Sequence, residues 1–447
     1  MRVLDRAKLA AAVPFPTAMA AQYALVAGLL AVAAFTRFWR LDTPDNFYFD
    51  EVYHAFTGRE FLRGNAAAWE FFATPPQGFA FEWTHPPLAK LFMAGGMLFI
   101  GENPLGWRFF GALLGVATVL LVYLLGKRLF KSEVVGLAAA FLLTFEGLSF
   151  VQSRVAMNDI YVVFFIVAAL YFLVSDRHLL SGIFFGAALA TKWSAIWTVF
   201  PIAFYFIYKF LQTERARRRS LLVESLLTVP YFFIVIPLFV YFLSYLPFFL
   251  TGHDLRDLWD LQRQMYWYHS GLEATHPYQS PWGTWPIMMR TIFYYISPSG
   301  DAKIYALGNP IIFWFGVPAL AFAGWQGLKR VRIRLDRGTG EVAIAGRLRE
   351  LDFGVLFVVV AYLSFLLPWA LSPRIMFLYH YLPSVPFLAL AGGYAIWRLW
   401  QRRWGRRGAI ALLTAAFLAF VYFYPHLAAV PVPGWLGESY FWFPTWR

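Results

Sequence analysis

The segment RFFGALLGVATVLLVYLLGKRLFK, residues 108–131, places a long apolar run between one arginine and a basic cluster. A run of about 17 to 25 apolar residues is long enough to cross the hydrocarbon core of a bilayer as a helix. The whole chain shares this character, since 60% of its 447 residues are hydrophobic and only 14% are charged. The sequence therefore predicts an all-α polytopic membrane protein.

Eleven segments of this kind follow one another along the chain, separated by charged or Pro-rich breaks. The first resembles a signal peptide, but no convincing cleavage site follows it and further spans come at once, so we interpret it as a retained helix. The sequence thus predicts a single integral membrane domain over residues 1–447. The expected transmembrane helices are 18–36, 109–126, 134–151, 159–175, 179–192, 194–211, 226–249, 309–328, 353–371, 378–397 and 408–426.

The basic residues predict the orientation, because Lys and Arg are retained on the cytoplasmic side during insertion. The net charge of +13 is then mostly a topology signal. Nucleic-acid binding is disfavoured, because the basic residues are divided among loops instead of sharing one face with stacking aromatic residues. With a cytoplasmic N-terminus, every dense basic cluster falls inside, at 127–131, 176–178, 214–219, the loop 329–352 and 398–407.

Two long segments, 38–108 and 250–308, then fall outside, together with a C-terminal tail from about residue 427. Function is expected there, since binding and catalytic groups concentrate on loops. The first segment alternates polar and apolar residues, which indicates amphipathic helices along the membrane surface. The second is dense in Trp, Tyr and Pro, and aromatic residues at this depth usually act as interfacial anchors. The chain has no cysteine, so disulfides and thiolate metal sites are excluded.

Asp50 and Glu51 stand side by side in the first outer segment, within NFYFDEVYHAFTGREFLRGN, residues 46–65. Acids at the start of a helix complement the positive end of its dipole, so capping explains the pair by itself. A carboxylate at the membrane boundary can equally act as a general base on a hydroxyl group. The two roles are compatible, and position alone does not separate them.

Several basic residues are expected at the outer ends of spans, where the charge rule does not place them. Each alone is explained by snorkelling toward lipid phosphates, whereas several that converge would form a cationic pocket for a phosphate. Lys192 is the strongest single candidate, because it interrupts the apolar run ALATKWSAIW, where an unpaired ammonium is costly. The full set is Lys90, Arg108, Arg154, Lys192, Arg290 and Arg374.

Asp159 and His85 can each be interpreted in two ways, as structural residues or as members of the site. Asp159, in SRVAMND, suits a helix cap or a place in the same pocket. His85, before two prolines, suits a turn or a hydrogen bond to a sugar hydroxyl or a phosphate oxygen. The sequence has no zinc-hydrolase HExxH motif, no Ser- or Cys-nucleophile motif and no nucleotide-binding P-loop. We therefore expect a reaction that draws its energy from the substrate and needs no metal or other cofactor.

Taken in order, these residues resemble the motifs of the protein O-mannosyltransferases, glycosyltransferase family 39. The resemblance covers essentially the whole chain, and it implies the GT-C fold with about eleven transmembrane helices. The similar stretches are FDEV at 49–52, HPPLAK at 85–90, RFFGALLG at 108–115, SRVAMND at 153–159, TKWSAIW at 191–197, HPYQSPWGTWP at 276–286 and RIMFLYHYLPSVPFLAL at 374–390.

This similarity also implies a reaction. Asp50 would activate a Ser or Thr hydroxyl of a secreted or membrane protein, with Glu51 supporting it, and a polyprenyl-phosphate mannose would donate the sugar on the outer face with inversion. The acceptor-side candidates are His276, Tyr278 and Trp282. The candidates for binding the donor phosphate and sugar are His85, Lys90, Arg108, Arg154, Asp159, Lys192 and Arg374.

One departure from the family concerns the second outer segment. Eukaryotic members carry a large soluble β-trefoil insertion there, whereas 250–308 is short in this chain. The chain therefore resembles a bacterial or archaeal member, which implies a prokaryotic plasma membrane with the active site and the C-terminus outside. Association with the secretion machinery and formation of a homo-oligomer both stay open.

Two other functions stay open on the residues alone. A related GT-C transferase that moves another sugar from a polyprenyl phosphate to a glycolipid would need the same acid and cations. A membrane transporter would place ionisable residues near mid-membrane on broken helices. The acids of this chain lie at the outer boundary instead, which disfavours transport.

Overall fold

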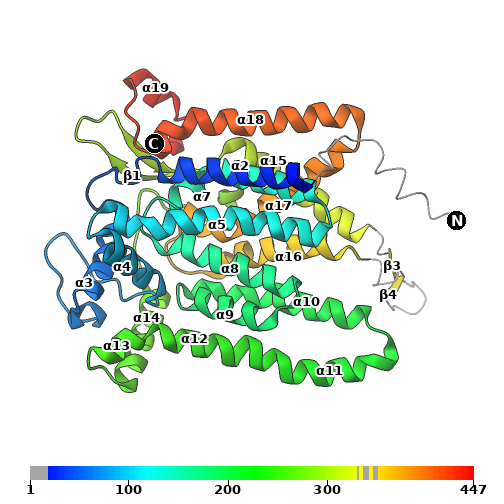
Figure 1. Ribbon diagram of the computed structural model, residues 1–447, viewed down its shortest axis with the longest axis horizontal. Helices are drawn as coiled ribbons and strands as arrows, with labels where there is room; N and C mark the ends of the chain where they lie inside the picture. Colours follow the sequence, from blue (N-terminus) through cyan, green and yellow to red (C-terminus); the bar gives the residue numbers. More distant parts are fainter. Residues whose placement is uncertain (1–18, 330–331, 336–341, 346–350) are drawn as a thin grey trace.

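The computed structural model describes residues 19–329, 332–335, 342–345 and 351–447. Long helices run side by side along one direction, and short helices, a hairpin and loops gather at one end of them (Figure 1). Among the described residues, seven helices are long and apolar enough to cross a membrane. The prediction of an all-α polytopic membrane protein is confirmed.

The seven long segments agree with seven of the expected spans. Three of them are composite: the third begins as a 3-10 turn, the fourth passes through a π-helical turn after Pro230, and the sixth ends in a 3-10 turn. They are α2 (Met19–Phe38), α5 (Pro104–Phe130), η3 (Trp193–Thr198) with α10 (Val199–Gln212), α11 (Arg215–Pro230) with η4 (Tyr231–Val235) and α12 (Ile236–Ser244), α15 (Pro310–Leu328), α16 (Phe353–Leu366) with η7 (Leu367–Leu371), and α18 (Arg403–Leu427).

The other four expected spans are also helical, but their helices are shorter. α9 has 12 residues, which at about 1.5 Å per residue is shorter than the ~30 Å hydrocarbon core. The helices α6, α8 and α17 are mostly buried in the bundle, whereas α9 also exposes Leu179, Leu180 and Ile183. The four are α6 (Glu133–Thr144) with α7 (Gly147–Gln152), α8 (Asn158–Val174), α9 (His178–Leu189), and η8 (Leu378–Ser384) with α17 (Val385–Trp400).

The expected outer segments build the crowded end of the molecule, together with α13, which the sequence predicts as the end of the span 226–249. The strands β1 and β2 pair there as an antiparallel hairpin. The elements at this end are η1 (Phe49–Val52), α3 (His54–Leu62), η2 (Ala66–Trp69), α4 (Leu88–Ile100), α13 (Leu246–Leu250), α14 (Leu255–Gly271), η5 (Trp282–Ile287), β1 (Ile292–Ile296), β2 (Lys303–Ala306), α19 (Gly434–Ser439) and η9 (Pro444–Trp446).

The first outer segment contains two helices of different character, α3 and α4. The helix α4 packs against both α3 and α5, and it is apolar on its exposed side as well, where Leu98 and Phe99 lie in the open. It is therefore an apolar helix, whereas α3 buries Ala55 and Phe56 and leaves Arg59 and Glu60 partly exposed.

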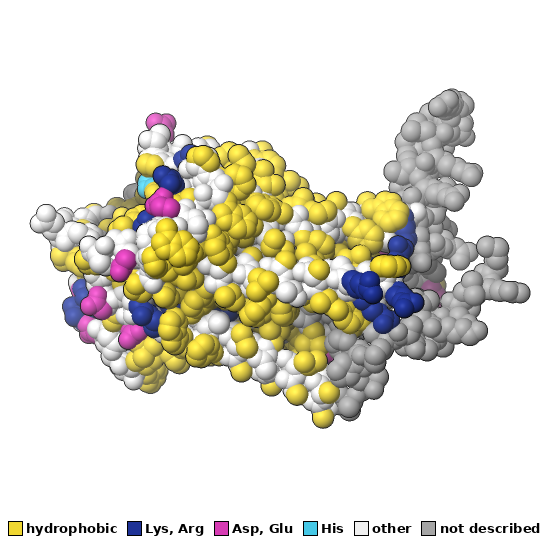
Figure 2. Space-filling model, turned by 90° about the horizontal axis from the view of Figure 1, so that it is seen from above, with side chains coloured by type: hydrophobic (Ala, Val, Ile, Leu, Met, Phe, Trp, Pro, Cys, Tyr) yellow, Lys and Arg dark blue, Asp and Glu magenta, His cyan; other side chains and the backbone are white. Residues whose placement is uncertain are grey.

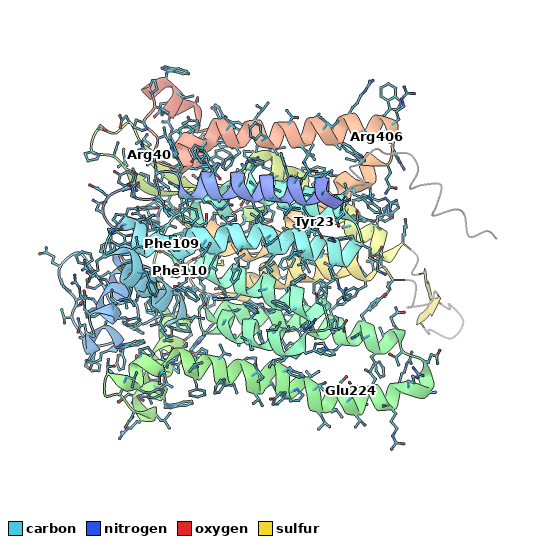
Figure 3. The ribbon with its side chains drawn as sticks, viewed as in Figure 1. Tyr23, Arg40, Phe109, Phe110, Glu224 and Arg406 are labelled. Atoms are coloured by element: carbon cyan, nitrogen blue, oxygen red, sulfur yellow. The ribbon has the colours of Figure 1, made fainter. Side chains whose placement is uncertain are left out.

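The opposite end carries the basic clusters. Tyr23, Glu224 and Arg406 lie toward that end, whereas Arg40, Phe109 and Phe110 lie toward the crowded end (Figure 3). Hydrophobic side chains cover the surface between the ends, and a group of Lys and Arg side chains lies at the end opposite the acidic ones (Figure 2). The strands β3 (Arg332–Leu335) and β4 (Val342–Ala345) pair within the predicted basic loop, most of which lies outside the described residues.

The core of the bundle lies around α6, α8 and α17, whose inward residues are almost fully buried. Close approach of helices requires small residues here. A Cβ atom on Gly136 of α6 would lie 2.6 Å from the Tyr123 carbonyl oxygen of α5, so only glycine fits. Tight packing of this kind fixes the helix ends at the crowded end of the molecule, and those ends carry the candidate site.

Side-chain caps set where the helices begin. Asn103 accepts a hydrogen bond from the Gly106 amide and Pro104 follows it, which starts α5 at the crowded end. Asp254 and Asp257 form a capping box at the start of α14. The helices that carry the site therefore begin at positions that the local sequence specifies.

Candidate active site

Asp50 and Glu51 both lie in η1, yet their carboxylates face different surroundings. The Glu51 side chain is fully buried and accepts hydrogen bonds from Arg108, from the Trp107 indole and from the Ala156 amide. It thereby joins the first outer segment to α5 and to the turn before α8. Glu51 holds the loop in place, and Asp50 is left to face the cavity.

Arg108 uses all of its N–H groups at this junction. Its Nε and one Nη2 hydrogen go to Glu51, and the remaining N–H groups donate to the carbonyls of Leu41, Pro44 and Asn46. A guanidinium has five N–H donors, and all of them are used here. The side chain is 1% exposed, so Arg108 lies outside the cavity and has no donor free for a phosphate.

The Asp50 carboxylate is partly buried, and within the described part of the chain no group donates a hydrogen bond to it. Burial raises the pKa of Asp50 to about 6, and the nearby His54 and Lys192 only partly oppose this effect. A carboxylate without a partner and with a raised pKa is suited to accept a proton from a substrate hydroxyl.

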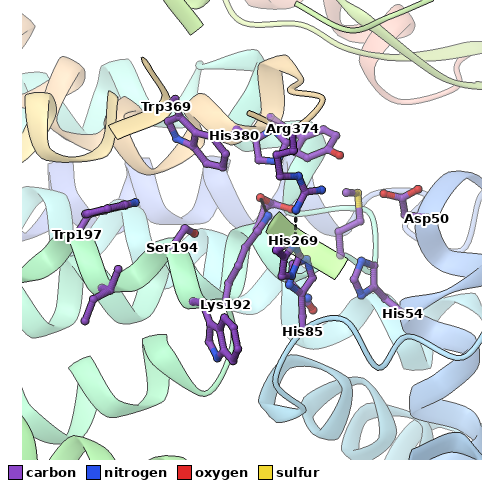
Figure 4. Close-up of a pocket in the computed structure, with 16 residues that line it drawn as sticks. Asp50, His54, His85, Lys192, Ser194, Trp197, His269, Trp369, Arg374 and His380 are labelled. Atoms are coloured by element: carbon purple, nitrogen blue, oxygen red, sulfur yellow. Dashed lines mark hydrogen bonds and ion pairs between the residues drawn. The ribbon is translucent and has the colours of Figure 1, made fainter. Parts of the chain in front are cut away.

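Asp50 lines a cavity of about 310 Å³ at the crowded end of the bundle (Figure 4). Lys192 and Arg374 enter the cavity from other parts of the chain, and tryptophans form part of its wall. Residues from six stretches of sequence line it, namely Asp50, His54, His85, Met157, Asn158, Asp159, Lys192, Trp193, Ser194, Ile196, Trp197, His269, Trp369, Arg374, Tyr379 and His380.

Lys192 and Asp159 form a buried ion pair in the cavity wall, with 2.9 Å between Nζ and Oδ1. Lys192 follows α9 directly and Asp159 stands in the first turn of α8, so the packing of these two helices brings them together. Asp159 supplies the partner that the buried ammonium requires. One ammonium can still donate further hydrogen bonds to a ligand, because it has three N–H groups.

Arg374 reaches the cavity from the turn between η7 and η8, and it contacts Nδ1 of His269 in α14. The ring of His269 stacks on that of His85, with centroids 4.9 Å apart, and His85 lies parallel to His54. Three imidazoles thus form a row along the cavity between Asp50 and Arg374 (Figure 4).

The other predicted cations are occupied elsewhere. Lys90 is buried against Glu82 and the His85 carbonyl, where it fixes the loop before α4. Arg154 donates to four carbonyls at the end of α2, from Thr36 to Arg40. Arg290 contacts the Pro277 carbonyl. The structure therefore brings together Lys192 and Arg374 and places Lys90, Arg108, Arg154 and Arg290 outside the cavity.

The acceptor-side candidates also lie outside it. His276 lines a second cavity, of about 620 Å³, between the turn before η5 and the C-terminal residues. Tyr278 and Trp282 pack against the main core. The second cavity borders the Arg374 turn, since the Ser280 amide donates to the Met376 carbonyl over 2.9 Å.

Several cavity residues were missed by the sequence analysis. His54 follows Asp50 by four residues and therefore lies one turn further on, which is a signal that could have been used. His269 had none, because it is one aromatic residue among many on a surface helix. Among the described residues, no three His, Asp or Glu side chains are grouped closely enough to hold a metal ion.

The chain matches two family models that together cover almost its full length. Residues 28–252 match the model described as dolichyl-phosphate-mannose-protein mannosyltransferase. Residues 254–446 match the C-terminal four-transmembrane region of protein O-mannosyltransferase. The chain belongs to the protein O-mannosyltransferase family. As a member of that family it is a glycosyltransferase, and the resemblance noted in the sequence is confirmed.

Individual relatives agree with the family assignment. A polyprenol-phosphate-mannose–protein mannosyltransferase of Mycolicibacterium smegmatis is 28% identical over 97% of this chain and 94% of its own length. Among solved structures, the O-mannosyltransferase Pmt1–Pmt2 complex of S. cerevisiae, bound to the sugar donor, matches 99% of this chain and 94% of its own with a TM-score of 0.79 at 16% identity. ArnT of Cupriavidus metallidurans, bound to undecaprenyl phosphate, covers 92% of this chain and 77% of its own with a TM-score of 0.58 at 13% identity. This chain therefore has the GT-C fold.

Proposed function

We propose that this enzyme transfers a mannosyl residue from a polyprenyl-phosphate mannose to Ser or Thr hydroxyls of polypeptides, with Asp50 as the general base. The observation that carries the proposal is one cavity that joins an unpartnered carboxylate to two cations, Lys192 and Arg374. The carboxylate suits the incoming hydroxyl, and the cations suit the phosphate that leaves.

The reaction then proceeds as a single displacement. Asp50 accepts the proton of the acceptor hydroxyl while the hydroxyl oxygen bonds to C1 of the mannose. The bond from C1 to the phosphate oxygen breaks, and its electron pair leaves with the polyprenyl phosphate. Lys192 and Arg374 stabilise the charge that develops on that phosphate. A phosphate leaves without protonation, so one carboxylate is sufficient, and the displacement inverts the anomeric centre.

The apolar part of the cavity suits the lipid end of the donor. Trp193 lines the cavity, and Trp197 and Trp369 line it on the side away from Asp50 (Figure 4). Ile196 also lines it and is 45% exposed on the bundle surface. The first isoprene units of the donor would pass along this wall into the bilayer, while the phosphate stays between Lys192 and Arg374.

The two ends of the bundle support the proposed orientation. The basic clusters gather at the end opposite the cavity, so the charge rule assigns that end to the cytoplasm and the cavity to the outer face of a prokaryotic plasma membrane. Because the chain has no native cysteine, single-cysteine variants test this directly. An impermeant maleimide should label Ser299→Cys, but not Arg403→Cys, in intact cells; the reverse pattern would overturn the orientation.

The reaction itself is tested with purified enzyme, polyprenyl-phosphate mannose and a Ser/Thr-rich peptide. We expect the mass of the peptide to rise by one hexose per modified residue. Transfer to a glycolipid extract but not to the peptide would instead favour the glycolipid transferase. Crosslinking in membranes would show whether a second copy or a component of the secretion machinery lies beside the enzyme.

A further inference from the structure

His269 lies near the C-terminal end of α14, and both of its ring nitrogens have a partner. Nε2 lies 2.7 Å from the Thr84 carbonyl oxygen, and Nδ1 contacts Nη1 of Arg374. A carbonyl only accepts hydrogen bonds and a guanidinium only donates them. The hydrogen of the ring must therefore be on Nε2, and Nδ1 accepts from Arg374. The structure specifies one neutral tautomer.

The surroundings keep His269 in this state. Arg374 lies against it from the η7–η8 turn, Lys192 lies near it from the turn after α9, and His85 stacks on its ring. Glu82 is the acidic group near it, but Glu82 is already paired with Lys90. Burial and the positive charge of Arg374 lower the pKa of His269 to about 4. The ring is thus a neutral acceptor at ordinary pH.

Arg374 needs such an acceptor because its own turn does not hold it. The residue lies between η7 and η8, outside any regular helix, and its Nε is buried without a hydrogen bond among the described residues. Among the described residues, no carboxylate forms an ion pair with Arg374. A long side chain of this kind has many rotamers, and a fixed contact reduces the entropy lost when a ligand binds.

We propose that His269 is a positioning residue, which holds the Arg374 guanidinium in the cavity so that it can bind the donor phosphate. The inference rests on the proposed function in one respect, namely that Arg374 receives this phosphate. It also gives the second outer segment a role, because α14 would set the position of a cation in the donor site. An acidic partner would hold Arg374 more strongly but would neutralise it, and a neutral imidazole leaves its charge available.

The test uses equilibrium binding of polyprenyl phosphate, which carries the phosphate but no sugar. The amide oxygen of Asn lies near the position of His Nδ1, so His269→Asn should keep the contact with Arg374 and bind within about threefold of the wild type. The longer Gln places its amide near Nε2, so His269→Gln should lose that contact and weaken binding about tenfold. His253→Gln, in the same outer segment but outside the cavity, is the control and should bind as the wild type does.

A double-variant cycle separates positioning from a general effect on the fold. If His269 acts through Arg374, then His269→Gln should have no further effect on binding in an Arg374→Met background. Independent, additive losses would overturn the inference, and so would equal losses for the Asn and Gln variants. Unchanged binding in Arg374→Met alone would also overturn it. Failure of the wild type to transfer mannose would count against the proposed function only, because this assay contains no sugar. Thermal unfolding of each variant identifies one that does not fold, and the Asn variant then carries the test.

Discussion

Arg108 and Glu51 form a buried, two-pronged ion pair, in which Nε and Nη2 of Arg108 each lie 2.8 Å from one carboxylate oxygen of Glu51. Both side chains are shielded from solvent, and the arginine also donates hydrogen bonds to three backbone carbonyls of the first outer segment. This pair fixes η1 on the end of α5. It therefore determines where the neighbouring Asp50 carboxylate lies, although neither partner lines the cavity.

Glu51→Gln should destabilise the folded enzyme, because it leaves a buried arginine without its counter-charge. Breaking a buried pair in this way typically costs about 3–5 kcal/mol. We expect a clearly lower midpoint of thermal unfolding in detergent. The double variant Glu51→Gln/Arg108→Met should recover part of the loss, since it no longer buries an unpaired charge. A wild-type midpoint for Glu51→Gln would mean that the pair does not hold the loop.

Asp50→Asn should behave in the opposite way, with loss of turnover and no loss of stability. The amide has the shape of the carboxylate but cannot accept the hydroxyl proton, so the rate should fall by at least about 10². Burial raises the pKa of Asp50 in the folded state to about 6. The folded protein thus binds this proton more tightly than the unfolded chain does, and the ionised carboxylate lowers the free energy of unfolding above pH 6.

The stability of Asp50→Asn should accordingly depend on pH. The variant should unfold at a higher temperature than the wild type at pH 8, and the difference should shrink as the pH falls from about 6 toward the normal value for an aspartate. Turnover above about a tenth of the wild-type value would remove Asp50 from the role of base. Equal midpoints across the pH range would show that the carboxylate is well solvated.

The rate of the wild-type enzyme should fall in acid. A general base must be ionised, so kcat/KM should decrease about tenfold per pH unit below a pH of about 6. The measurement is a pH profile of mannosyl transfer to a peptide at donor concentrations well below KM. An acid limb near pH 4 would assign the limiting ionisation to a normal, solvated carboxylate instead of Asp50.

Lys192→Met should raise the donor KM and lower kcat, because the same ammonium binds the phosphate and stabilises it as it leaves. Removing one group that stabilises charge in the transition state commonly lowers kcat by a factor of about 10². Lys209→Met is a matched control, since Lys209 also pairs with an aspartate, Asp176, but at the opposite end of the bundle. Near-wild-type constants for Lys192→Met would remove Lys192 from the donor site.

Activity should survive treatment with EDTA. In the proposed reaction, the charge of the leaving phosphate is stabilised by Lys192 and Arg374, and among the described residues no three His, Asp or Glu side chains are grouped closely enough to hold a metal ion. The measurement compares initial rates after chelation and after readdition of Mg²⁺ or Mn²⁺. Complete loss followed by recovery with metal would make Asp50 and Asp159 metal ligands.

The sequence alone determined the environment and the class of fold. Long apolar runs have to cover their backbone hydrogen bonds as helices in a bilayer, so length and composition predict the spans without knowledge of their packing. The order of motifs, from FDEV at 49–52 to the stretch at 374–390, also indicated the family. Asp50 stood out because adjacent carboxylates are conspicuous in a chain with so few charges. Position alone did not separate a helix cap from a general base, and only the family resemblance implied the role of base.

Only the tertiary structure decided which charges share a site. Six cations had the same signal in the sequence, a basic residue at the outer end of a span, yet only Lys192 and Arg374 line the cavity. Arg108 and Arg154 instead use their N–H groups on Glu51 and on backbone carbonyls. The difference depends on the rotation of each helix and on the turn that follows it, and these are set by packing between segments far apart in the chain. Local sequence specifies that an arginine is present, whereas its partner is specified by contacts that form only when the helices have assembled.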